Sequence, residues 1–179
     1  MKWIAIAGSW HKINSEIESK IRQTVCEIFE AGNGIVSGGA LNVDFIALDE
    51  ALKLNSGADR IKIFLPTTLN KYSEHYRKHA KLGNIIQEQA EALIGQLASL
   101  KHINPTALVE NPNTDFTEET KKAMYFDRIS RIIEAADELI AFAIKTKPGE
   151  GLGTADTIEK ARVKGIPVIE YKYDLSGKA

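Results

Sequence analysis

The sequence has little of two features that would point to secretion or to a membrane. Cys26 is the only cysteine among 179 residues, so no disulfide can form within the chain and a reducing compartment is expected. No apolar run approaches the ~18 residues that cross a bilayer. The short run at residues 3–7 is not followed by a signal-peptide cleavage pattern. We therefore expect a cytoplasmic protein with no membrane partner.

The chain also lacks an excess of charge of either sign. It carries 23 lysine and arginine residues against 24 aspartate and glutamate residues, a formal net charge of −1. Proteins that bind long nucleic acids through phosphate contacts usually present a basic surface, so this balance argues against such a partner. Hydrophobic residues make up 44% of the sequence, which is typical of a globular domain that buries a core without disulfide or metal staples.

Short apolar runs alternate along the chain with segments of helical periodicity. Such runs are typical of strands buried on both faces of a parallel sheet, and they occur at residues 3–7, 35–37, 61–65, 138–143 and 166–171. Ser15 and Glu18 form a capping-box pattern, which predicts Ser15 as the N-cap of the first helix. The alternation predicts an α/β fold whose mostly parallel sheet has about five strands.

One domain is expected over residues 1–179, with a less regular stretch at about 70–116. Within that stretch Asn84 is predicted to cap a helix over residues 85–100. Two prolines and an asparagine-rich run then indicate a loop or a short edge element. We predict that the stretch is an inserted helical segment near one edge of the sheet.

Three predicted strands end in turns that carry glycine or small hydroxyl residues. In parallel sheets, ligands bind beyond the carboxyl ends of the strands, where backbone amides and helix N-termini face an anion. The turns supply the candidate ligand-binding residues Gly8, Ser9, Ser37, Gly38, Gly39, Asp44, Gly151, Gly153 and Thr154. The alternative for each turn is structural, since glycine also permits tight strand–helix packing. The last turn fits neither a Walker loop nor the dinucleotide fingerprint, and no cofactor is predicted.

The motifs IAGS, IVSGGALNVD, ADELIAF and GLGTADTIEKARVKGIPVI together resemble the superfamily of Rossmann-like domains that includes the DNA-processing protein A and the lonely-guy phosphoribohydrolases. The resemblance covers most of the chain outside about 70–116 and is greatest to small stand-alone members. It implies a Rossmann-like three-layer fold, a small nucleotide-like ligand at the glycine turns, and a homodimer. Leu41 and Asn42 replace the Arg-Gly pair that relatives usually carry in the second turn.

The same resemblance supplies two candidate catalytic residues, Arg128 and Asp156. They stand at positions similar to an arginine and the first acidic residue of the phosphoribohydrolases, but Thr157 occupies the place of the catalytic glutamate. In the related nucleoside deoxyribosyltransferases a carboxylate acts as nucleophile, for which Asp127 is a further candidate.

Three functions remain open from the sequence. The first, which we favour, is a protein that binds a nucleotide or nucleotide-derived phosphate ligand at the glycine-rich turns, as a sensor, carrier or processing protein. The second is an N-glycosidase, a hydrolase or transferase acting on the bond between base and sugar. The third, by analogy with the DNA-processing protein, is a single-stranded DNA-binding protein.

A segment rich in histidine and aromatic residues follows the third predicted strand. His75 and His79 would share one helical face, but no third ligand appears at useful spacing, and no metal site is predicted. Part of this segment is interpreted as reaching over the site to stack a base or neutralise a phosphate, or else as an exposed helix with mixed charges. Its members are Tyr72, His75, Tyr76, Arg77 and Lys81.

Overall fold

The computed structural model of the chain describes residues 1–147 and 152–177. Within these residues six parallel strands form one sheet in the order β4-β3-β2-β1-β5-β6. The strands are β1 (Trp3–Gly8), β2 (Gly34–Ser37), β3 (Ile61–Phe64), β4 (Leu108–Val109), β5 (Glu138–Lys145) and β6 (Val168–Asp174). The predicted α/β class is confirmed. The sheet exceeds the expected number of strands because the two-residue β4 adds an edge beside β3.

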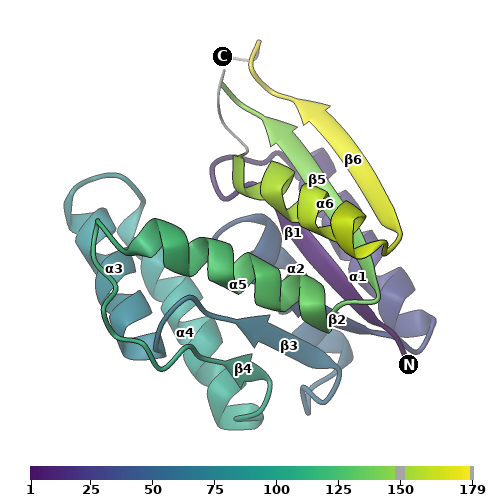
Figure 1. Ribbon diagram of the computed structural model, residues 1–179, viewed down its shortest axis with the longest axis horizontal. Helices are drawn as coiled ribbons and strands as arrows, with labels where there is room; N and C mark the ends of the chain where they lie inside the picture. The colour runs from purple at the N-terminus through teal and green to yellow at the C-terminus, as the bar shows by residue number, and fades with distance from the viewer. Residues whose placement is uncertain (148–151, 178–179) are drawn as a thin grey trace.

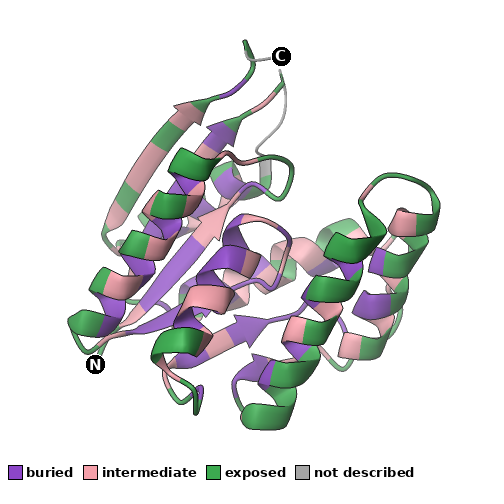
Figure 2. Ribbon diagram, turned by 180° about the vertical axis from the view of Figure 1, so that it is seen from behind, coloured by how far each residue is buried: buried purple, intermediate pink, exposed green. Residues whose placement is uncertain are grey.

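Helices cover both faces of this sheet and give the three-layer architecture (Figures 1 and 2). On one side lie α1 (Ser15–Glu30) and α2 (Val43–Leu54), and on the other lie α5 (Lys121–Ala135) and α6 (Leu152–Lys164). Among the helices in the described ranges, none is long and apolar enough to cross a membrane.

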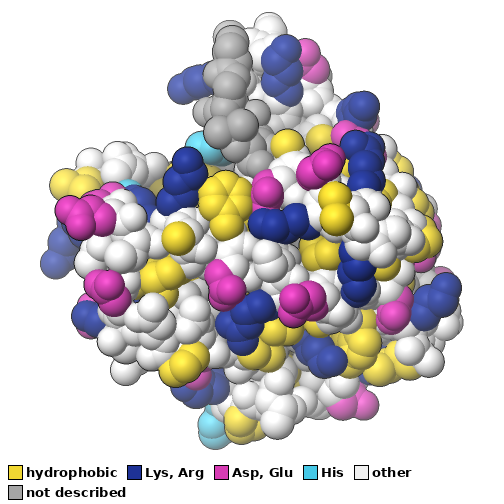
Figure 3. Space-filling view, in the orientation of Figure 1, with side chains coloured by type: hydrophobic (Ala, Val, Ile, Leu, Met, Phe, Trp, Pro, Cys, Tyr) yellow, Lys and Arg dark blue, Asp and Glu magenta, His cyan; other side chains and the backbone are white. Residues whose placement is uncertain are grey.

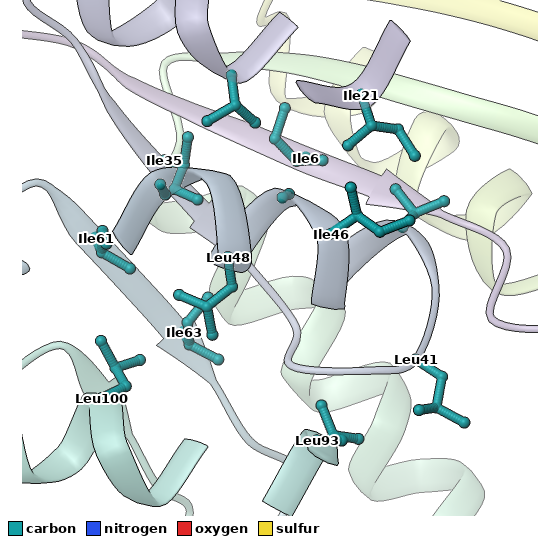
Figure 4. Close-up of a cluster of buried hydrophobic side chains, with 14 of the residues drawn as sticks. Ile6, Ile21, Ile35, Leu41, Ile46, Leu48, Ile61, Ile63, Leu93 and Leu100 are labelled. Carbon is teal, nitrogen blue, oxygen red and sulfur yellow. The ribbon is translucent and has the colours of Figure 1, made fainter. Parts of the chain in front are cut away.

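Alternate residues of the central strands face opposite helical layers. Ile4 and Ile6 of β1 belong to the cluster that includes buried residues of α1 and α2, whereas Ala5 packs with residues of α5 and α6. Figure 4 shows part of the first cluster, where Ile35 and Ile63 from neighbouring strands meet side chains of the covering helices. Burial on both faces explains why these strands read as unbroken apolar runs.

The first helix starts one residue earlier than the capping pattern predicts. Asn14 is the N-cap, and its Oδ1 accepts a hydrogen bond from the backbone N–H of Ile17 at 2.9 Å. The prediction of Ser15 as the cap is therefore wrong, since Ser15 is already helical. Glu18, expected to reach back to the cap, instead pairs with Arg22 one turn further on, at 2.9 Å.

The inserted helical segment folds as α3 (Leu69–Lys81) and α4 (Gln87–Ile103), followed by β4 at the sheet edge. The two helices pack against each other beside β3 and β4 (Figure 1). Asn84 is not the cap of α4, which begins after Ile86. The Asn84 side-chain amide instead lies 3.0 Å from Nδ1 of His79, near the end of α3. The sequence pattern missed this because the contact depends on the tight turn between the two helices.

Candidate functional site

The carboxyl ends of β1 and β2 and the first turn of α6 enclose a cavity of about 320 Å³, here called the first cavity. It gathers residues from three turns that are far apart in the sequence. Seven of the predicted site residues line it, namely Gly8, Ser9, Gly38, Asp44, Arg128, Gly153 and Thr154. Parallel strands place their carboxyl ends at one edge of the sheet, which is why turns after different strands converge here.

Close packing explains the glycines on the floor of the first cavity. A Cβ at Gly8 would lie 2.6 Å from Cγ2 of Val43, so the end of β1 touches the start of α2. A Cβ at Gly38 would lie 3.0 Å from Cζ of Arg128 and 3.1 Å from Oδ2 of Asp44. Glycine at position 38 thus leaves room for a charged pair beside the backbone of the second turn.

Asp44 and Arg128 are that pair. Asp44 is 7% exposed, and its Oδ2 accepts a hydrogen bond from the Ala40 N–H at 3.1 Å. Arg128 donates from Nη1 to the Gly38 carbonyl oxygen at 2.7 Å. Burial raises the pKa of Asp44, and the positive charge of Arg128 opposes that rise. The Nε of Arg128 is sealed from solvent and has no hydrogen-bond partner in the described part of the chain.

Three tyrosines surround the guanidinium of Arg128. The hydroxyl of Tyr72 donates to the Gly39 carbonyl oxygen at 3.1 Å and lies 3.3 Å from the hydroxyl of Tyr76. The ring of Tyr125 lies 5.0 Å from Cζ of Arg128, a cation–π distance. Burial raises the pKa of all three phenols, so they remain protonated at neutral pH and can donate hydrogen bonds.

Two predicted ligand-binding residues have structural contacts instead of a place on the cavity wall. Ser37 is fully buried, and its hydroxyl donates to the Ile6 carbonyl oxygen at 3.0 Å. Gly39 has a φ of +64°, and a Cβ there would lie 2.9 Å from Cγ2 of Ile63. These contacts fix β2 against β1 and shape the turn. Gly151, predicted in the third turn, lies outside the described residues.

The candidate catalytic residue Asp156 is absent from the described lining of the first cavity. Its Oδ2 accepts from Nζ of Lys160 at 2.7 Å, one helical turn along α6. Thr157, which stands where the resemblance expects a catalytic glutamate, does line the cavity. Its hydroxyl donates to the Gly153 carbonyl oxygen at 2.8 Å. A catalytic role for Asp156 stays a prediction.

Trp10 is a site residue that the sequence reasoning missed. Its side chain is 47% exposed and stacks on His11 with ring centroids 4.0 Å apart. Both residues line the first cavity directly after Gly8 and Ser9. The signal was a tryptophan among polar residues at a strand end, where no core-forming periodicity accounts for it.

A second cavity, of about 430 Å³, adjoins the first and is mostly apolar. Trp10, Ala40, Arg128, Ile129 and Gly153 line both, and we call the two together the cleft. The walls of the second cavity further contain aromatic and basic side chains from α3 and α5, namely His75, Tyr76, His79, Lys121, Lys122, Tyr125 and Phe126.

The segment that was predicted to reach over the site does so in part. His75 and Tyr76 line the second cavity. Arg77 faces α4 and pairs with Glu91 at 2.8 Å, while Lys81 lies on a separate surface. On the face covered by α5 and α6, basic and acidic side chains are interspersed (Figure 3).

No protein-family model matches the chain, and no curated protein matches its sequence. Among solved structures, it is similar to DNA processing protein A from Helicobacter pylori, described for its single-stranded DNA binding mode. The TM-score is 0.64 at 20% identity, over 94% of this chain and 64% of that one. The chain thus spans less than two-thirds of the length of that protein.

A second similar structure is the structural-genomics protein TM1055, with a TM-score of 0.50 at 15% identity over 94% of this chain and 72% of that one. At these identities the similarity concerns the fold. It confirms the Rossmann-like three-layer architecture that the sequence resemblance implies.

Proposed function

We propose that the cleft binds a nucleotide or a nucleotide-derived phosphate compound. The observation that carries this proposal is the convergence of three strand-end turns on one cavity, with Arg128 beside them. Its volume of about 320 Å³ falls in the range of small-molecule sites, roughly 300–1,000 Å³.

The phosphate would lie at the first cavity. The first turn of α6 offers backbone N–H groups and the positive end of a helix dipole, and the hydroxyls of Ser9 and Thr154 add donors. Arg128 supplies a local positive charge beside the second turn, where its Nη1 donates to the Gly38 carbonyl oxygen. These local donors suit a single anionic group, in keeping with a net charge of −1.

The base would lie toward the second cavity. Trp10 stands where the two cavities meet, and Tyr125 and Phe126 continue the apolar wall. Exposed aromatic faces bind nucleobases by stacking, worth about 1–3 kcal/mol per base. The hydroxyl groups and glycine turns of the first cavity and the aromatic side chains of the second thus match the two halves of a nucleotide.

Binding without chemistry fits the cleft better than cleavage of an N-glycosidic bond. Such cleavage uses a carboxylate beside the sugar. Asp156 pairs with Lys160, and Thr157 lines the cavity where relatives are expected to carry glutamate. Among the described residues that line the first cavity, Asp44 is the one carboxylate. Its Oδ2 already accepts a hydrogen bond from the Ala40 N–H. We therefore favour a sensor, carrier or processing role.

Single-stranded DNA binding is the second candidate function. The similarity in fold to DNA processing protein A supports it, and a strand could enter the cleft one nucleotide at a time. The net charge of −1 favours a small ligand, because a strand needs a continuous basic track.

Thermal unfolding with a panel of ligands tests the proposal. Inorganic phosphate, nucleoside mono-, di- and triphosphates and an oligothymidylate are each added in excess. A nucleotide at 100 times its Kd stabilises the folded state by about 2.7 kcal/mol, a rise in Tm of roughly 5–10 °C. Thr154→Val should reduce this rise, because it removes a donor without changing shape, and Thr106→Val, on an exposed loop, is the matched control.

The outcomes separate the alternatives. No stabilisation by any nucleotide overturns the proposal, and stabilisation by the oligonucleotide alone replaces it with DNA binding. Chromatography of the same mixtures should show no free base. Base release that is lost in Asp156→Asn would make the protein an N-glycosidase.

A further inference from the structure

His75 and His79 lie one turn apart on α3, and Glu118 approaches them from the turn before α5. The nearest ligand atoms of the three side chains all lie within 4.8 Å of one another. We propose that these three residues bind a divalent transition metal ion of the Zn²⁺ class. From the sequence only the histidine pair could be recognised. Glu118 comes close to it only when the insertion packs against the segment that leads into α5.

The donor set is one that Zn²⁺ accepts. Two imidazoles and one carboxylate, with an open fourth position, are a known ligand set, with metal–ligand distances of about 2.0–2.2 Å. A tetrahedral arrangement at those distances separates the ligand atoms by about 3.4 Å. In the present structure the ligand atoms are up to 4.8 Å apart. Rotation of the exposed Glu118 side chain and small shifts of the rings would shorten these distances to about 3.4 Å.

His79 provides an independent observation. Its Nε2 is sealed from solvent and has no hydrogen-bond partner in the described part of the chain. Its Nδ1 lies 3.0 Å from the Asn84 side-chain amide. Amide oxygen and nitrogen can exchange places without changing shape, so the Asn84 amide oxygen can accept a hydrogen bond from a protonated Nδ1. That contact would leave the Nε2 lone pair for a metal, the arrangement seen in most metal-bound histidines.

Neighbouring rings hold the side chain of His75 beside that of His79. The His75 ring lies 4.4 Å from that of His79 and 5.1 Å from that of Phe116, centroid to centroid. The two imidazoles therefore already stand together on one side of α3.

Two lysines hold the Glu118 carboxylate when no metal is bound. Lys121 is hydrogen-bonded to it, and Nζ of Lys78 lies 3.6 Å away. Both lysine side chains are flexible, so they can leave the carboxylate when an ion takes their place. Their charge lowers the expected affinity and places the site among exchangeable metal sites.

The two histidines lie at the wall of the cleft. His75 and His79 both line the second cavity, so an ion bound to them would stand beside the proposed base site. The proposal does not depend on nucleotide binding, because the metal alone is the probe.

Titration calorimetry with Zn²⁺ and the visible absorption of Co²⁺ test the site, in a Cys26→Ser background that removes the only thiol. We expect one ion per chain. His79→Ala and Glu118→Gln should each weaken binding about 100-fold, and Asn84→Ala about tenfold, as for outer partners of metal ligands. His102→Ala, on the exposed last turn of α4, is the control and should bind as the parent does.

Circular dichroism shows whether each variant is folded. Glu118 is exposed, so Glu118→Gln should fold normally even if a histidine variant does not. No binding up to millimolar metal, or binding that Glu118→Gln leaves unchanged, overturns the proposal. Tetrahedral Co²⁺ absorption that only His79→Ala, Glu118→Gln and Asn84→Ala diminish supports it.

Discussion

Gly38 and Gly39 are adjacent, and they serve different purposes in one turn. Gly38 leaves space for Arg128 and Asp44, so it belongs to the floor of the cleft. Gly39 has a positive φ and packs against Ile63, so it supports the core. The sequence predicted both as ligand-binding residues, because a pair of glycines after a strand looks the same whether ligand or side chain lies above it.

Substitution of Gly39 tests this difference. Gly39→Ala should lower the free energy of unfolding by about 2–4 kcal/mol, because the new Cβ meets both an unfavourable φ and close neighbours. Gly95→Ala, at an exposed position in α4 with nothing within 4 Å, should raise it by about 0.5–1 kcal/mol. Urea unfolding measures both, and equal effects of the two substitutions would contradict the assignment.

Asp44 should give the protein a pH-dependent loss of stability. Burial raises its folded pKa above the ordinary 3.8, so between the two values the folded chain holds a proton that the unfolded chain has released. The contribution of Asp44 to the free energy of unfolding therefore falls as the pH rises through that interval. Burial of the charged form outweighs its attraction to Arg128 and its hydrogen bond from Ala40.

Asp44→Asn should remove that slope. The attraction to Arg128 acts only on ionised Asp44 and is already included in the raised pKa, so the pH dependence of the difference between variant and parent carries the test. Urea unfolding from about pH 4 to about pH 7 should show the variant gaining stability relative to the parent as the pH rises. A difference that stays constant over the range would mean that the Asp44 pKa is not raised.

At the scale of elements, helix starts depend on which side chain has the right geometry. Both Asn14 and Ser15 are favourable caps, and the pattern with Glu18 favoured Ser15. In the folded chain Asn14 caps the helix, since Glu18 is engaged by Arg22, which also pairs with Asp49 of α2 at 2.6 Å. A contact between two helices thus determined which residue caps α1.

Asn14→Ala should lower the free energy of unfolding by about 1 kcal/mol, because it leaves the Ile17 N–H without its acceptor. Ser15→Ala should change it by less than about 0.5 kcal/mol, the range of ordinary surface substitutions. Thermal or urea unfolding distinguishes the two, and a larger cost for Ser15→Ala would restore the capping box.

The strands were more predictable than the insertion. Each central strand is buried on both faces and is therefore an unbroken apolar run in the sequence. The position of that run predicts the position of the strand. β4 has two residues, and its pairing with β3 comes from the position of α3 and α4. No local pattern of that length can indicate a strand.

At the scale of the whole molecule, the position of the cleft followed from topology. Parallel strands bring their carboxyl ends together, so the turns at Gly8, Gly38 and Thr154 could be assigned to one site from the sequence. The aromatic wall of the second cavity could not be assigned in this way. Trp10 follows β1, Tyr125 and Phe126 belong to α5, and they line one cavity with residues of α3, a long-range arrangement that periodicity does not contain.

A crystal structure of the protein grown with the nucleotide that stabilises it most tests nucleotide binding in the cleft. We expect phosphate density within about 3 Å of the backbone amides at Ser9 and Gly38 and of the Thr154 hydroxyl. The base should lie against Trp10 in the second cavity. A nucleotide bound away from the cleft, or a cleft that holds only water at saturating ligand, would exclude this binding mode.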